Sequence, residues 1–162
     1  MPNRPLLLLA LTLALTATPF APTFAQDASE PDPIVELPAE DVAMNAAKDE
    51  ARATLAQWLA VLDNPPLGAR EIGFKFPLEG WEHIWVANVR REGDFLEGQL
   101  ANAPHSEGHA YGDWVRVPLS DVSDWAYRDM DGVMQGHRTT RVLFSELPPE
   151  TVAEIKAAFG WE

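Results

Sequence analysis

The order of hydrophobic and polar residues divides the chain into an apolar start, an acidic stretch and a long patterned body. Arg4 precedes a nearly unbroken apolar run from Leu6 to Leu15, and Thr23-Phe24-Ala25 places small residues where a signal peptidase reads. The apolar run is too short to span a bilayer. We therefore expect residues 1–25 to be a secretory signal peptide that is cleaved before Gln26.

Residues 26–40 contain five acidic residues, three prolines and no basic residue, which is typical of an extended, solvated linker. From Asp41 to Leu62 the apolar residues recur at spacings of three and four, which predicts one long amphipathic helix capped by Asp41. Asn64-Pro65-Pro66 ends that helix because proline cannot continue the hydrogen-bond ladder. We place a single domain at residues 41–162.

Alternating apolar and polar residues follow this helix and predict a sheet. Strands are expected at 72–76, 82–89, 95–101, 114–117 and 137–144, with a short helical turn within 119–127 and a tight turn at Asp131-Gly132. Pro149 to Phe159 is predicted to form a short helix that Gly160 closes. The expected fold class is α+β: an antiparallel sheet of about five strands, with the long N-terminal helix packed on it and a short C-terminal helix.

Charge and cysteine content limit the kinds of partner and the cellular compartment that we expect. The formal net charge is −13, and the leader's only charge is Arg4, so cleavage makes the chain more acidic still. Such a chain repels nucleic acid and anionic lipid, and it suits a cationic protein partner. With no cysteine, the chain forms no disulfide and carries no lipid anchor, and no later apolar run is long enough to span a membrane. We expect a soluble periplasmic domain, with secretion as the alternative.

Five short segments resemble one bacterial family when they are taken together and in order. They are Glu82 to Val86, Gly98 to Pro104, Gly112-Asp113, Val122 to Trp125, and Gly136 to Leu143. This set is similar to the YegJ-like family, domain of unknown function 2314. The resemblance implies a small α+β domain, sometimes exported and sometimes attached to repeat proteins, with no established activity. The family pattern has two glycines before its threonine-rich segment, whereas His137-Arg138 follow Gly136 here.

Four polar residues are the candidates for catalysis. Glu82 and His83 begin a central strand, Asp124 lies beside Trp125, and His137 starts the last predicted strand together with Arg141. If these side chains meet, they form a cluster suited to acid–base work or to anion binding. The ordinary alternative is structural: Glu82 or Asp124 pairs with Arg141, His83 bonds to neighbouring backbone, and the tryptophans fill the core.

Two histidines, His105 and His109, are candidate metal ligands, with Glu107 or Asp113 to complete the set. Their spacing of four suits a helix, but Pro104 and Gly108 indicate an exposed polar loop. No cofactor motif, cysteine nucleophile or Gly-x-Ser-x-Gly elbow is present.

The candidate binding residues are Asn102, Asp113, Trp114, Trp125, Thr139 and Arg141. Thr139 and Arg141 would share a strand face with His137, and Arg116 could join them. The sequence favours a non-enzymatic binding module that uses the loop at 102–113 and the edge of the sheet, and an inhibitor or immunity-type role fits its acidic charge. The alternative is a small hydrolase-type enzyme using Glu82, His83, Asp124 and His137.

Overall fold

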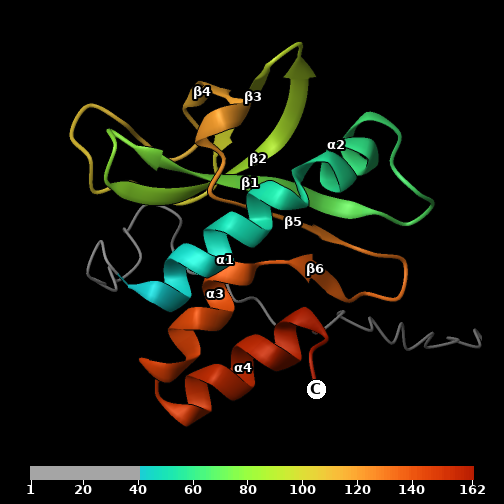
Figure 1. The fold of residues 1–162 in the computed structure, drawn as a ribbon, viewed down its shortest axis with the longest axis vertical. Helices are drawn as coiled ribbons and strands as arrows, with labels where there is room; N and C mark the ends of the chain where they lie inside the picture. Colours follow the sequence, from blue (N-terminus) through green and yellow to red (C-terminus); the bar gives the residue numbers. More distant parts are fainter. Residues whose placement is uncertain (1–40) are drawn as a thin grey trace, which may run out of the picture.

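The computed structural model describes residues 41–162, so the predicted signal peptide and linker lie outside the described residues. This part of the chain has a mixed α/β fold, with a six-stranded antiparallel sheet in the order β4-β3-β2-β1-β5-β6 (Figure 1). The strands are β1 (Arg70–Leu78), β2 (Glu82–Glu92), β3 (Phe95–Leu100), β4 (Trp114–Pro118), β5 (Asp124–Arg128) and β6 (Met134–Gly136). The helices are α1 (Val42–Ala53), α2 (Leu55–Asp63), α3 (Arg138–Val142) and α4 (Pro149–Phe159), with short 3₁₀ turns η1 (Leu119–Asp121) and η2 (Leu143–Ser145).

Two helices occupy the stretch in which the periodicity predicts one. A carboxylate oxygen of Asp41 accepts the backbone N–H of Met44 at 2.6 Å, so Asp41 caps α1. The break falls at Thr54, whose hydroxyl donates to the Glu50 carbonyl at 2.7 Å and replaces regular helical geometry with a local turn. The apolar positions still lie on one side, because Ala51 and Trp58 are both fully buried.

These helices cover one face of the sheet and form the main hydrophobic core with it. Phe74 on β1 is paired with Val86 on β2 and with Trp125 on β5, and all three are buried. Two tryptophans tie the helices to β5: Trp58 donates its indole N–H to the Ala126 carbonyl at 3.1 Å, and Trp125 donates to the Ala51 carbonyl at 3.0 Å. Buried tryptophans commonly satisfy their N–H in this way.

The predicted strand at 137–144 is wrong, since this segment forms α3 and η2. Gly136 and His137 both have positive φ angles, 79° and 52°, and they turn the chain out of the sheet directly after β6. A side chain at Gly136 would place its Cβ 2.0 Å from the Trp125 carbonyl oxygen, so glycine is required there. The predicted helical turn within 119–127 is confined to η1, and β5 follows it.

The C-terminal helix is confirmed over Pro149–Phe159, with Gly160 in the left-handed conformation at its end. Rings from this end of the chain form a second aromatic cluster. The His137 ring lies 4.2 Å from the ring of Trp85 and 4.6 Å from that of Phe159, and the Trp161 indole N–H donates to the Met134 carbonyl at 2.7 Å. Figure 1 shows α3 and α4 together at one end of the molecule, with β3, β4 and the β2–β3 hairpin at the opposite end.

Candidate functional site

Glu82 holds the loop that joins β3 to β4. One carboxylate oxygen accepts the backbone N–H of His105 at 2.8 Å, and the other accepts the N–H and hydroxyl of Ser106 at 2.9 and 2.8 Å. Burial opposes ionisation of Glu82, but these hydrogen bonds outweigh it and lower the pKa of the carboxyl. Glu82 therefore anchors a loop, and neither it nor Asp124 forms an ion pair with Arg141 within residues 41–162.

His83 belongs to a small network at the start of β5. Its Nδ1 lies 2.9 Å from the Ser123 hydroxyl oxygen, which also lies 3.2 Å from the Lys75 carbonyl oxygen. A serine donates one proton, so donation to Lys75 leaves Ser123 to accept from His83 Nδ1–H. Burial, with nearby Lys48, Lys75 and Arg52, lowers the pKa of His83 to about 4. The imidazole is neutral at pH 7, and Ser123 is fully buried.

Asp124 is the anchor of α3. Its Oδ2 accepts both the backbone N–H and the hydroxyl of Thr139, at 2.8 and 2.7 Å, and its Oδ1 accepts the N–H of Trp125 at 2.9 Å. Asp124 is fully buried and Thr139 nearly so, which makes this pair a link between β5 and α3. The threonine that the sequence assigns to an exposed strand face is thus inside the fold.

Lys75 lies between Asp124 and Trp85 in the register of the sheet. Its ammonium group is 5.5 Å from the centre of the Trp85 ring. Burial lowers the pKa of Lys75, with Asp124 opposing this effect and Lys48 adding to it.

His137 is also held in its neutral form. Burial lowers the pKa of His137 to about 3, assisted by Lys75, Arg141 and Arg128, and its Nδ1 lies 3.0 Å from the Thr140 hydroxyl oxygen. His137 is therefore neutral at pH 7.

A grouping of aromatic and charged side chains lies on one face of β2, β3 and β4. We call it the β2–β4 face, and its members are Arg90, Glu92, Phe95, Glu97, Trp114 and Arg116. Glu97 accepts from Arg90 at 2.8 Å and from Arg116 at 2.6 Å, and Arg116 also donates to Glu92 at 2.8 Å. The hydrogen bonds from Arg90 and then Arg116 lower the pKa of Glu97.

Each arginine of this network also covers an aromatic ring. The Arg90 guanidinium lies 5.4 Å from the centre of the Trp114 ring, and that of Arg116 lies 4.4 Å from the Phe95 ring. Trp114 is nevertheless 57% exposed and Phe95 38% exposed. Trp114 and Arg116 were candidates from the sequence, whereas Arg90, Glu92, Phe95 and Glu97 were not. Their grouping depends on strand register, including the bulge in β2 between Ala87 and Arg90 that sets Arg90 opposite Glu97.

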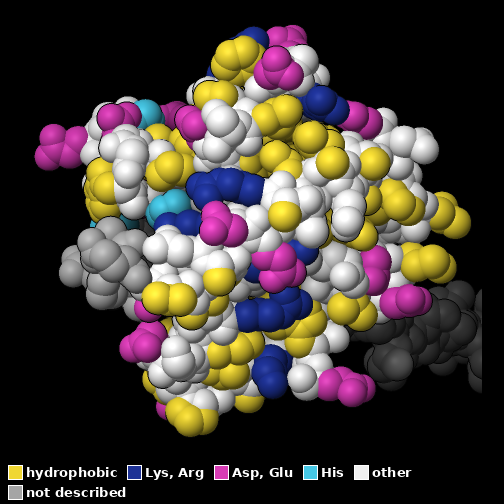
Figure 2. Space-filling view, in the orientation of Figure 1, with side chains coloured by type: hydrophobic (Ala, Val, Ile, Leu, Met, Phe, Trp, Pro, Cys, Tyr) yellow, Lys and Arg dark blue, Asp and Glu magenta, His cyan; other side chains and the backbone are white. Residues whose placement is uncertain are grey.

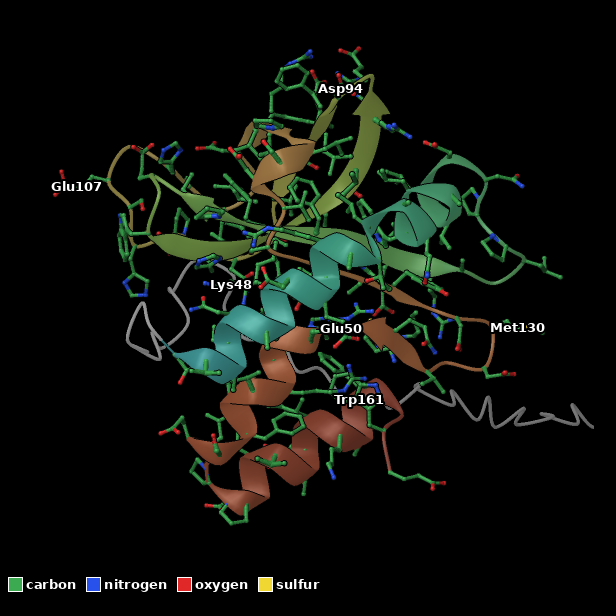
Figure 3. The ribbon with its side chains drawn as sticks, in the orientation of Figure 1. Lys48, Glu50, Asp94, Glu107, Met130 and Trp161 are labelled. Carbon is green, nitrogen blue, oxygen red and sulfur yellow. The ribbon has the colours of Figure 1, made fainter. Side chains whose placement is uncertain are left out.

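The loop residues predicted as metal ligands have other contacts. His109 Nε2 lies 2.9 Å from Glu79 Oε1, and Asp113 accepts the backbone N–H of Ala110 at 2.8 Å. Figure 3 shows Glu107 at the outer end of the loop, pointing away from the sheet. Within residues 41–162, no three histidine, aspartate or glutamate side chains are grouped to hold a metal ion.

The remaining binding candidates are scattered. Trp125 is only 5% exposed and lies in the core. Asn102 lies in the loop after β3, Arg141 lies on α3 beside β6, and Arg116 lies at the opposite edge of the sheet, so the proposed joining of Arg116 to Thr139 and Arg141 is wrong. None of the helices in residues 41–162 has the length and apolar character needed to cross a bilayer.

Comparison with known proteins shows the family. Residues 41–162 match the model of a family described as an uncharacterised protein conserved in bacteria, domain of unknown function 2314, and the chain belongs to this family. It is also 30% identical over 80 residues to a protein of Neisseria meningitidis serogroup B that is named as an ankyrin repeat protein. That match covers 49% of this chain and 31% of the relative, so the chain spans about a third of the relative's length. No solved structure matches.

Proposed function

We propose that this chain is an exported, non-enzymatic binding module that docks a protein partner on the β2–β4 face. The observation that carries the proposal is the exposure of Trp114 and Phe95 on a surface whose charged side chains are already paired with one another. Aromatic side chains and arginine dominate the centres of protein interfaces. The ion pairs hold these side chains in place, so little side-chain entropy is lost when a partner binds.

The geometry favours contact with the face of the sheet over addition of a strand at its edge. β4 is an edge strand, but it is only five residues long, carries Arg116 and ends at Pro118. Short edge strands with charged residues and proline resist pairing with another strand. A partner would therefore lie across Trp114, Arg116 and Phe95.

The partner is expected to be a cationic protein. Figure 2 shows acidic side chains from top to bottom of the visible face, with basic side chains between them, in keeping with the net charge of −13. Such a field speeds association with a basic protein and weakens as salt is added. The relative from Neisseria meningitidis supports an interaction role, because its similar segment belongs to a protein that is named for ankyrin repeats.

The apolar leader, Leu6 to Leu15, supports export to the periplasm. The five segments that occur in order from Glu82 to Leu143 support the YegJ-like naming of the family. The alternative, a hydrolase using Glu82, His83, Asp124 and His137, has less support. Both carboxylates are occupied by hydrogen bonds that hold the fold together.

A matched pair of tryptophan variants tests the docking surface. Trp114 and Trp81 are about equally exposed, at 57% and 54%, but only Trp114 belongs to the β2–β4 face. The full chain, Trp114→Ser and Trp81→Ser would each be immobilised and exposed to a periplasmic extract, with captured proteins quantified and the leading one purified for binding measurements.

We expect Trp81→Ser to retain the partner and Trp114→Ser to bind it at least about tenfold more weakly. Equal capture by both variants would contradict the proposed surface. Export is tested separately: protein recovered from the periplasm should begin at Gln26, and a chain that retains Met1 in the cytoplasm would contradict it.

A further inference from the structure

A cavity of about 530 Å³ lies between α1, β6 and α3, far from the β2–β4 face. Exposed and buried alanines of α1, among them Ala46 and Ala47, form its apolar wall, and Glu50 lies one turn further along the same helix. Gln135 lines it from β6, and Arg138 and Arg141 line it from α3. Figure 3 shows Glu50 on α1 and Trp161 beside α4 and β6; Glu50 contacts Arg138, and Trp161 contacts Arg141.

Both guanidinium groups are held against tryptophan rings. That of Arg138 lies 4.4 Å from the Trp125 ring, and its Nε donates to Glu50 at 2.9 Å. That of Arg141 lies 3.8 Å from the Trp161 ring, and its Nη1 donates to the Gly136 carbonyl. Stacking on one side and a hydrogen bond on the other restrict both groups, so the cavity has a preformed pair of cations.

Only one of the two arginines, Arg138, forms an ion pair with a carboxylate of residues 41–162. Glu50 contacts Arg138 alone, and no carboxylate of residues 41–162 forms an ion pair with Arg141. Arg138 Nη1 is covered and lacks a hydrogen-bond acceptor among the described residues. Burial and then the charge of Arg138 lower the pKa of Arg141, and the charges of Asp124 and Glu50 oppose this effect. A covered polar atom such as Arg138 Nη1 usually has a partner.

The scaffold around the cavity is rigid. Gly136 allows the chain to pass directly over Trp125, and the hydrogen bonds from Thr139 to Asp124 fix the start of α3. Arg138 and Arg141 are therefore presented from a helix that contacts within the domain hold in place.

We propose that this cavity binds a single carboxylate group, carried by a small organic acid or by a peptide C-terminus, with Arg141 as the main ligand and Arg138 as the second. Among the side chains that line the cavity, two guanidinium groups and Glu50 leave one positive charge, and the charge of Asp124 also acts on Arg141, so the site suits a monoanion better than a dianionic phosphate. The planar guanidinium presents parallel donors that suit a carboxylate. The alanine wall contacts the apolar part of the molecule. This site is independent of the partner surface proposed above.

Titration of the full chain, followed by NMR of the Trp161 indole and the Ala47 amide, tests the proposal with butyrate and its uncharged analogue butyramide. We expect saturable shifts with butyrate alone. Arg141→Gln should weaken binding about tenfold or more, because it removes the charged donor. Ala46→Leu should fill the cavity and abolish binding, whereas Ala53→Leu, an exposed alanine of α1 outside the cavity, should leave it unchanged.

Absence of saturation with butyrate, equal binding of butyramide, or equal effects of the two leucine variants would overturn the proposal. So would tighter binding of inorganic phosphate than of butyrate. Melting temperatures of all variants show whether each is folded. Alanyl-alanine with a free or an amidated C-terminus then distinguishes the sources: a peptide site binds the free form more tightly than butyrate, and an organic-acid site does not.

Discussion

Two regions of this domain combine arginine with an aromatic ring, and they differ in what surrounds the pair. On the β2–β4 face, Arg90 and Arg116 cover Trp114 and Phe95 and share Glu97 as a carboxylate partner. At the α3 end, Arg138 and Arg141 cover Trp125 and Trp161, but only Arg138 has a carboxylate partner among the described residues.

Under the two proposals above, the same chemical groups serve two kinds of recognition. Where every cation is paired and the rings remain exposed, the surface offers hydrophobic contact to a large partner. Where the rings are more covered and one cation lacks a carboxylate partner, we expect the site to attract a small anion. Burial and the supply of carboxylates, more than residue type, separate the two regions.

The largest expected loss of stability comes from removing Asp124, which supports α3 but not the β2–β4 face. Asp124→Ala leaves three buried donors unpaired, and we expect it to lower the free energy of unfolding by about 3 kcal/mol. Urea unfolding measures this loss, and Asp121→Ala, an exposed aspartate nearby, is the control. Where Asp124→Ala still folds, partner binding on the β2–β4 face should persist while butyrate binding is lost. Loss of partner binding in the folded variant would show that the two regions are coupled.

An intermediate effect on the free energy of unfolding is expected from lowering the pH, because His137 is buried in its neutral form. The unfolded chain takes up a proton on His137 below about pH 6.5, whereas the folded protein does so only near pH 3. Stability from this group is therefore lost as the pH falls through that window, by up to about 1.4 kcal/mol per pH unit. In His137→Asn, which tolerates the positive φ, unfolding between pH 6.5 and 4 should depend less steeply on pH. An unchanged slope would contradict a buried, neutral His137.

The smallest effect on stability is expected on the β2–β4 face itself. Arg116→Gln removes an exposed arginine from a surface network, so the melting temperature should change little. Partner binding should nevertheless weaken about tenfold, because Phe95 and Glu97 lose their organising neighbour. Arg91→Gln is the control, since Arg91 pairs with Asp63 away from this face. A much lower melting temperature for Arg116→Gln would mean that the network stabilises the fold and not the interface.

Local signals predicted much of the architecture. The cap at Asp41, the alternating residues of β1 to β4, and the helix from Pro149 to Gly160 depend on neighbours in sequence, and the structure has all of them. The strand predicted at 137–144 is wrong. Its threonines favour a strand locally, but Thr139 donates two hydrogen bonds to Asp124 and lies in a helix. No local pattern contains that contact, which joins residues fifteen positions apart.

The candidate sites show the same division. The sequence alone placed the residues along the chain: acidic residues throughout, Arg138 and Arg141 shortly after Gly136, and Trp114 at the start of a predicted strand. Tertiary structure decided their roles. The bulge in β2 brings Arg90 to Glu97, and the turn at Gly136 and His137 carries Arg138 and Arg141 to α1. Residue type sets which interactions are available, but long-range packing determines which partner each charge meets and how much water remains around it.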